Sequence, residues 1–182
     1  PLISLYDTLA DDRAAFSKQS VMGGFLKWLD GWTCRRADVI FLDTDAHIEY
    51  FVKTFRLPRA SFVRVFVGAD ERVFTPRVRA RQDGAFHVTF VGKFTPLHGI
   101  HAVIQAAHLL KGEPDIVFTC VGSGQLSDEI HNLAESLALT HVRFIDWMDY
   151  DKLPDLLAES DVCLGIFGVT EKAGRVIPGK VY

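Results

Sequence analysis

The sequence lacks several features that would assign a protein class at once. No run of apolar residues approaches the roughly 20 that a membrane-spanning helix needs, and the start has no signal-peptide layout. The net charge of −3 argues against a nucleic-acid-binding protein, because such proteins usually present a strongly basic face. With 48% hydrophobic and 24% charged residues among 182, the composition is that of a soluble globular protein, not a disordered chain.

Cysteine and metal-ligand clusters are also scarce. Cys34, Cys120 and Cys163 cannot all pair and none lies in a C-x-x-C arrangement, so we expect small, reduced, buried side chains. His98 and His101 have a spacing seen in metal sites, but no cysteine or acidic residue lies close by in the sequence. We therefore expect neither a metal nor a cofactor.

From Gly84 onward, apolar runs alternate with amphipathic segments. Parallel strands need crossover connections, and strands buried on both faces read as continuous apolar runs. The pattern therefore predicts an α/β fold: a Rossmann-like parallel sheet with flanking helices. The expected strands cover residues 86–91, 116–121, 142–145 and 162–166, and the expected helices cover 101–111, 126–137 and the region around 153–157.

The first 75 residues carry similar but fewer elements, which predicts a partial second α/β domain. Strands are expected over residues 2–6, 37–42 and 62–67, and a helix over 45–55 with Thr44 as its cap. We assign residues 1–76 to the end of one domain, 77–84 to a linker and 85–182 to a second domain. Because the chain starts at Pro1 inside an apolar run and ends at Val181-Tyr182 without a stop signal, we expect both ends to be cut.

An aromatic stripe precedes the second expected strand. Val21, Phe25, Trp28, Leu29 and Trp32 recur at helical spacing. One interpretation is a helix packed on the sheet, and the other is contact with a membrane surface. The neighbouring basic residues are Lys18, Lys27, Arg35 and Arg36.

Two glycine-rich turns follow expected strands, at the positions where α/β sheets bind ligands. One runs from Gly92 to Gly99 and the other from Gly122 to Gly124. Glycine lets a backbone approach a phosphate, and the start of a helix presents N–H groups to it. Lys93 would add a full charge and His98 a hydrogen bond. The alternative is that both turns are only tight connections.

The last segment carries charges of both signs directly after the fourth expected strand. This pattern suits a sugar diphosphate, whose phosphates need cations and whose hydroxyls need a carboxylate. A solvated loop is the alternative. The residues are Gly168, Glu171, Lys172, Arg175 and Lys180.

Taken in order, these motifs resemble the retaining glycosyltransferases of GT-B architecture, of the bacterial group-1 type. The resemblance spans nearly the whole chain. Its motifs are Ala37-Asp38-Val39-Ile40, the stretch from Val67-Gly68-Ala69-Asp70 to Phe74-Thr75-Pro76, Val91-Gly92-Lys93 through His98-Gly99, Val121-Gly122-Ser123-Gly124, Val142-Arg143-Phe144, and Leu157 to Leu164.

The resemblance implies a donor domain for a nucleoside-diphosphate sugar, preceded by the end of an acceptor domain. Lys93 and His98 would contact the diphosphate without a metal, although the family usually has lysine where His98 stands. The base would lie against Asp146, Trp147 and Met148. The wider set of expected donor contacts comprises Gly92, Gly99, Gly122, Gly124, Gly168, Arg175 and Lys180.

The family typically has two glutamates seven residues apart in its last segment. Counting from Glu171, the partner position is Gly179, so that spacing fails here. We expect Glu171 and Lys93 to be the catalytic residues and attribute the missing carboxylate to truncation. The isolated chain would then bind nucleotide weakly and transfer no sugar.

The expected function is transfer of a hexose, with retention, to a saccharide or lipid-linked acceptor in polysaccharide biosynthesis. The expected location is the cytoplasm, with peripheral contact at the inner membrane face left open, and no nucleic-acid partner is expected. A sugar-nucleotide epimerase of the same architecture and a non-catalytic nucleotide-binding module are the alternatives.

Overall fold

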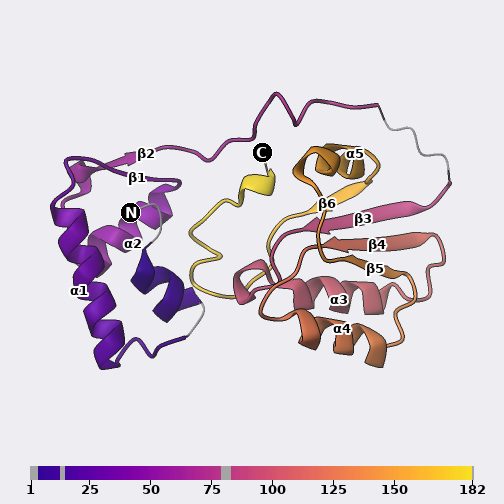
Figure 1. Ribbon diagram of the computed structural model, residues 1–182, viewed down its shortest axis with the longest axis horizontal. Coiled ribbons are helices and arrows are strands. Elements are labelled where there is room, and N and C mark those ends of the chain that lie inside the picture. The colour runs from indigo at the N-terminus through magenta and orange to yellow at the C-terminus, as the bar shows by residue number, and fades with distance from the viewer. Residues whose placement is uncertain (1–3, 13–14, 79–82, 182) are drawn as a thin grey trace. The chain divides into compact units, whose positions relative to one another are not determined.

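The computed structural model describes residues 4–12, 15–78 and 83–181, and its contacts divide the chain into two compact units (Figure 1). The N-terminal unit comprises Pro1–Gly68 together with Val169–Tyr182, and the sheet unit comprises Ala69–Gly168. Both are mixed α/β structures with parallel strands, so the predicted fold class is confirmed. By contacts the last residues group with the N-terminal unit, whereas the sequence placed them in the second domain; the domain boundaries remain a prediction.

The sheet unit contains one parallel sheet in the order β5-β4-β3-β6. Its core is formed by apolar side chains from both the strands and the helices, among them Phe90, Phe118, Ile104 and Ile130. The strands are β3 (Phe86–Val91), β4 (Ile116–Val121), β5 (Val142–Ile145) and β6 (Val162–Leu164), and the helices are α3 (Ile100–Leu109), α4 (Ser127–Ser136) and α5 (Leu153–Ala158).

The helices of this unit divide between the two faces of its sheet. Figure 1 shows α3 and α4 together on one side and α5 on the other. Parallel crossovers are right-handed, so a chain that moves from β3 to β4 to β5 places both connecting helices on one face. The chain then returns past β3 to β6, which places α5 on the opposite face.

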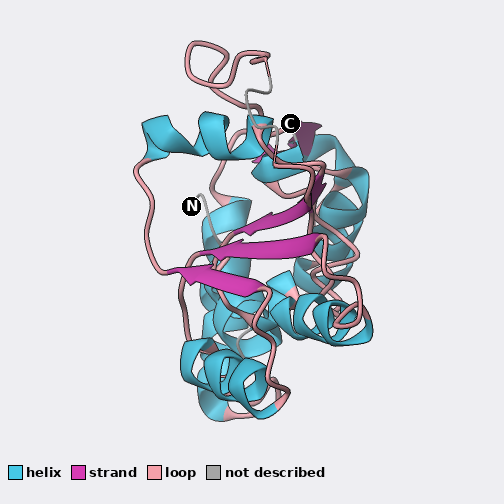
Figure 2. Ribbon diagram, turned by 90° about the vertical axis from the view of Figure 1, so that its right-hand side faces the viewer, coloured by secondary structure: helices cyan, strands magenta, loops and turns pink. Residues whose placement is uncertain are grey.

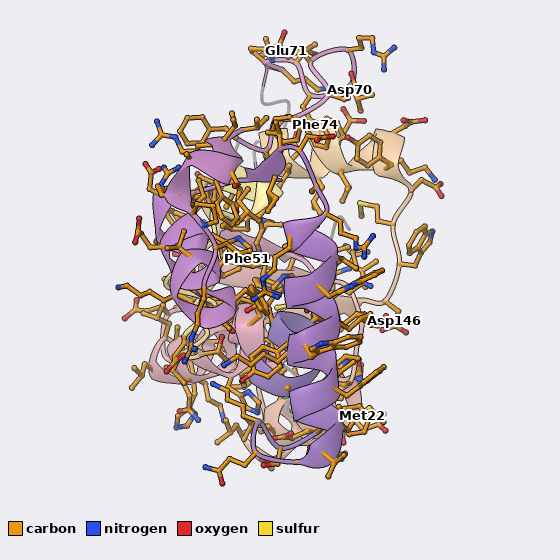
Figure 3. The ribbon with its side chains drawn as sticks, turned by 90° about the vertical axis from the view of Figure 1, so that its left-hand side faces the viewer. Met22, Phe51, Asp70, Glu71, Phe74 and Asp146 are labelled. Atoms are coloured by element: carbon orange, nitrogen blue, oxygen red, sulfur yellow. The ribbon has the colours of Figure 1, made fainter. Side chains whose placement is uncertain are left out.

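The N-terminal unit is built around a two-stranded parallel sheet and two long helices. Phe51 lies in its interior (Figure 3), with its ring 5.0 Å from that of Phe55 and 6.3 Å from that of Phe62. Thr44 caps α2 by accepting a hydrogen bond from the backbone N–H of His47, as the sequence predicts. The elements are a π-helix (Tyr6–Asp12), α1 (Val21–Arg35), β1 (Ile40–Leu42), α2 (Asp45–Phe55) and β2 (Phe62–Arg64).

The strand predicted over residues 2–6 is wrong where the structure describes it. Tyr6 begins the π-helix, and its N–H donates to a carboxylate oxygen of Asp30 at 2.8 Å instead of to a neighbouring strand. The hydroxyl of Ser4 donates to the same oxygen at 2.6 Å and accepts from the N–H of Asp7. Side-chain partners therefore replace sheet pairing here, and an apolar pattern cannot reveal them. The first residues of the predicted strand lie outside the described part.

Two further details differ from the sequence-based expectation. The strands predicted over 37–42, 62–67 and 162–166 are shorter and span 40–42, 62–64 and 162–164. Cys163 is exposed, because β6 has a neighbour on only one side. Among the described residues, no helix is long and apolar enough to cross a bilayer.

One matched pair of substitutions tests the core of the sheet unit. Ile104 is fully buried on α3, whereas Leu109 on the same helix is 82% exposed. We expect Ile104→Ala to lower the free energy of unfolding by about 3 kcal/mol. We expect Leu109→Ala to change it by less than about 0.5 kcal/mol. Urea unfolding followed by circular dichroism measures both, and equal losses would contradict the assigned core.

Candidate functional site

The strand order creates a topological switch point at β3. This strand pairs with β4 on one side and with β6 on the other, so the chain moves from β3 towards β4 and β5 and later returns to the opposite side of β3. Figure 2 shows strands of the sheet side by side. Ligands of open parallel sheets bind beyond the carboxyl ends of the strands at such a point. The residues that follow the four strands at this edge include Gly92 and Lys93, Gly122 and Gly124, Trp147 and Met148, and Gly168.

The two glycine-rich turns lie side by side, backbone against backbone. The N–H of Gly92 donates to the carbonyl of Val121 at 2.9 Å. Gly122 has a φ of 134°, and a Cβ atom there would lie 2.0 Å from the carbonyl oxygen of Gly92. A Cβ at Gly124 would lie 2.6 Å from the oxygen of Phe94. These glycines are therefore needed for the approach of one turn to the other, whether or not a phosphate binds.

A second close approach joins the start of α3 to the loop after β6. Gly99 has a φ of 62°, and a Cβ there would lie 2.3 Å from the carbonyl carbon of Phe167. A Cβ at Gly168 would lie 2.3 Å from the oxygen of Leu97, and the carbonyl of His98 accepts a hydrogen bond from the N–H of Phe167. The structure thus brings Gly99, His98 and Gly168 together at the switch point.

Lys93 and Trp147 are two exposed side chains at this edge that a ligand could contact. Lys93 is exposed and, within the described residues, its side chain has no hydrogen-bond or ion-pair partner. Trp147 is 80% exposed and has no ring contact among those residues. Met148 is half-buried, and the ring of His98 packs edge-on against Phe90 at 6.2 Å. A cation and an aromatic surface therefore face solvent beside the glycine turns.

The predicted site residues of the last segment belong to the N-terminal unit, where they have protein partners. Arg175 donates to the buried carboxylate of Asp7 at 2.9 Å, and its guanidinium lies 3.7 Å from the ring centre of Tyr50. The hydroxyl of Thr44 donates to the carbonyl of Arg175. Glu171 is exposed and lies 3.9 Å from Lys18 and 3.6 Å from Arg175.

Asp7 is the centre of a charge cluster that the sequence did not predict. Its side chain is 2% exposed, and Lys172 lies 2.9 Å and His47 3.7 Å from its oxygens. Burial by itself raises the pKa of Asp7, but the contacts with His47 and Lys172 and the charge of Arg175 outweigh it and lower the pKa to about 2. The carboxylate is therefore ionised at neutral pH.

Burial lowers the pKa of another predicted site residue, Lys180, to about 8. The ammonium group loses water in the folded unit, which favours the neutral amine. Lys180 lies in the short 3-10 helix Gly179–Val181. Its side chain still carries a proton in most molecules at neutral pH.

A cavity of about 720 Å³ opens beside Asp7 in the N-terminal unit. Its polar lining includes Asp7, Asp43, His47 and Lys172, and the imidazole Nδ1 of His47 lies 2.8 Å from Asp43. Its apolar wall includes Phe41 and the residues that follow β2. The signal for it in the sequence is an acidic residue directly after an apolar run, which is Asp7 after residues 2–6 and Asp43 after β1.

Neither the carboxyl edge of the sheet nor the cavity beside Asp7 gathers a set of metal ligands in the described part of the chain. Among the residues that the structure describes, no group of three or more histidine, cysteine, aspartate or glutamate side chains is arranged to hold a metal ion. His101, which the sequence paired with His98, contacts Glu129 through its ring at 2.7 Å. Metal-free binding remains a prediction.

Comparison with known proteins gives one family. The family model described as "Glycosyl transferases group 1" matches residues 72–175. Among curated proteins, the D-inositol 3-phosphate glycosyltransferase of Corynebacterium urealyticum is 28% identical over 145 residues. That match covers 69% of this chain and 34% of the relative, so the chain spans about a third of the relative's length.

Solved structures with the same fold have more distant sequences. Anabaena Alr3699/HepE in complex with UDP and glucose has a TM-score of 0.66 and 18% identity, covering 87% of this chain and 44% of that protein. A mutant of S. aureus TarM, in complex with Fondaparinux, alpha-GlcNAc-glycerol and UDP, has a TM-score of 0.62 and 13% identity, covering 81% of this chain and 29% of that one. At these identities the likeness shows the fold alone.

The charge cluster at Asp7 predicts a pH-dependent stability. Because the folded pKa lies below the ordinary value of 3.8, the ionised carboxylate stabilises the unit by about 2 kcal/mol above that pH. Asp7→Asn should therefore destabilise the unit by about this amount near neutral pH. The difference from the wild type should shrink as the pH falls from about 4 towards 2. Urea unfolding followed by tryptophan fluorescence measures it.

Asp38→Asn is the matched control, because Asp38 is an exposed aspartate of the same unit with no ion-pair or hydrogen-bond partner in the described residues. It should behave as the wild type near neutral pH. A difference between wild type and Asp7→Asn that stayed constant down to about pH 2 would contradict the ionised cluster.

Proposed function

This chain belongs to the glycosyl transferases group 1, and we propose that its sheet unit binds the nucleoside-diphosphate sugar of a retaining glycosyltransferase. The observation that carries the proposal is the carboxyl edge of the sheet. There the turns at Gly92 and Gly122 meet, Lys93 has no protein partner among the described residues, and Trp147 is exposed. A cation such as the Lys93 ammonium attracts a phosphate, and an aromatic face suits a base.

The proposed mechanism is electrostatic. Lys93, with three N–H donors, would hold the diphosphate and stabilise its charge as the glycosidic bond breaks. His98, just before α3, would add a hydrogen bond, whereas the N–H groups of Gly92 and Gly122 already donate to the carbonyls of Val121 and Ile145. No metal is required in this proposal, because the charge that develops on the leaving diphosphate meets a fixed cation. Transfer of a hexose with retention is proposed for a protein as long as the curated relative, of which the match to this chain covers 34%.

The last segment belongs to the N-terminal unit, and its role as a source of donor contacts stays a prediction from the sequence. Glu171 is exposed, so its oxygens can accept hydrogen bonds from sugar hydroxyls. Arg175 already pairs with Asp7. We therefore propose that its main role is to position this segment and that direct contact with a phosphate is secondary. Lys180 stays mainly protonated at neutral pH and is kept as a proposed phosphate contact.

The cavity beside Asp7 supports a proposal for the acceptor. Its volume of about 720 Å³ lies in the range typical of small-molecule sites. Carboxylates accept hydrogen bonds from the hydroxyls of a sugar, and the side chains of Lys172 and His47 can donate hydrogen bonds to those hydroxyls. The mixed lining, polar at Asp7 and Asp43 and apolar at Phe41, suits a saccharide or the sugar end of a lipid-linked acceptor.

Calorimetric titration with UDP-sugars and GDP-sugars tests the donor site, and UDP is tried first because the HepE and TarM structures contain it. We expect weak binding by this chain. Lys93→Ala should weaken it about tenfold through loss of a charge-assisted contact. Lys111→Ala is the control. Lys111 lies just after the C-terminal end of α3, away from the glycine turns, and donates to the carbonyl of Leu137.

Two outcomes would contradict the proposal. One is an absence of heat with every nucleotide sugar; the other is equal weakening by the Lys93 and Lys111 substitutions. A whole protein that epimerised its donor without transferring the sugar would favour the epimerase alternative instead.

A further inference from the structure

Helix α1 has one buried face and an exposed apolar face opposite it. One face is buried in the N-terminal unit and consists of Gly23, Leu26, Asp30, Gly31 and Cys34. At 100° per residue, the opposite face is centred about half a turn away from it. That opposite face consists of Val21, Phe25, Trp28 and Trp32, with exposed fractions of 93%, 52%, 58% and 42%. The sequence-based interpretation that this stripe packs on the sheet is wrong for these four residues, whereas its fifth member, Leu29, is half-buried.

The exposed aromatic residues form a continuous strip. The rings of Phe25 and Trp28 stack at 6.0 Å with an angle of 28°, and those of Trp28 and Trp32 at 6.3 Å with an angle of 24°. Met22, 45% exposed, extends the apolar surface at the start of the helix (Figure 3). The outer face of a surface helix normally carries polar residues. We call Val21, Phe25, Trp28 and Trp32 the aromatic strip.

The charges around the aromatic strip have one sign on α1. Arg36, the residue that caps the helix, lies over the ring of Trp32 at 4.5 Å. Arg35 is exposed and donates to the carbonyl of Phe55 at 2.8 Å, and Lys27 is exposed and lies 5.8 Å from the ring centre of the buried Tyr6. The single acidic residue of α1, Asp30, is 3% exposed and accepts hydrogen bonds from the Ser4 hydroxyl and the Tyr6 N–H. The solvent-facing surface of α1 is therefore aromatic and positively charged.

We propose that the aromatic strip docks on the surface of a membrane that contains anionic lipids. Tryptophan favours the level of the lipid headgroups, and helices with an aromatic face and flanking basic residues lie in the plane of that interface. Anionic headgroups complement Arg36, whose guanidinium lies over Trp32 of the strip. With its charged residues, α1 lies on the bilayer and does not cross it. Docking is independent of nucleotide binding, so each can fail without the other.

Vesicle co-sedimentation tests the docking directly. The chain should sediment with vesicles of phosphatidylcholine that contain phosphatidylglycerol, and much less with phosphatidylcholine alone. High salt should weaken the binding, because it screens exposed charges. Failure to sediment with the anionic vesicles, or equal binding to both compositions, overturns the proposal.

Two pairs of variants separate the contributions. Trp28→Ala should weaken vesicle binding about tenfold through loss of buried apolar area, whereas Leu109→Ala, which removes an 82% exposed leucine from α3, should not. Arg36→Gln should weaken it about fivefold, and the control Lys53→Gln on α2 should have less effect. Unchanged circular dichroism shows that each variant is folded. Binding that is insensitive to Trp28→Ala in a folded protein overturns the proposal.

Fluorescence locates the helix at the bilayer. In the Trp147→Phe variant, the remaining tryptophans are Trp28 and Trp32, both on α1. Their emission should shift to the blue with anionic vesicles and be quenched by lipids brominated on the acyl chains. A protein that sediments without this quenching overturns the proposal. So does a stable dimer that buries these tryptophans without vesicles, because the strip would then be a protein interface.

Discussion

Parallel pairing of β3 with both β4 and β6 is the constraint on which the sheet unit depends. Because all of these strands run in one direction, every loop that leaves them starts at the same edge. The loops can meet only where no Cβ intervenes, which is why Gly92 and Gly122 touch through their backbones. This contact holds Lys93 at the switch point with its side chain in solvent. The proposed donor site is thus a consequence of strand order.

In the N-terminal unit the corresponding constraint is the burial of Asp7. A buried carboxylate is costly unless cations and hydrogen bonds surround it. Lys172 and Arg175 supply them from the far end of the sequence, so this ion cluster ties the last segment to the first. The same cluster leaves Lys172 and His47 on the wall of a cavity, beside carboxylates. One electrostatic requirement therefore both closes the unit and gives the cavity its polar lining.

The position of Asp30 decides the character of α1. Its carboxylate points inward, where it organises the residues around Ser4 and Tyr6. A solvent-facing acid on this helix would repel an anionic surface, and its burial removes that obstacle. Buried polar groups such as the Ser4 hydroxyl and the Tyr6 N–H need hydrogen-bond partners, and Asp30 is that partner. Because this face of α1 is buried, the opposite face with its tryptophans is exposed.

From the sequence alone, the α/β class, the strand positions of the sheet unit and the cap at Thr44 followed, because periodicity and capping are local properties of the chain. The family resemblance also came from local motifs. Only the tertiary structure decided that β6 pairs with β3, that Arg175 contacts Asp7, and that Trp28 is exposed. The first two findings join residues that are distant in sequence, and the third selects one face of α1 for burial. None of them leaves a periodic signal in the sequence.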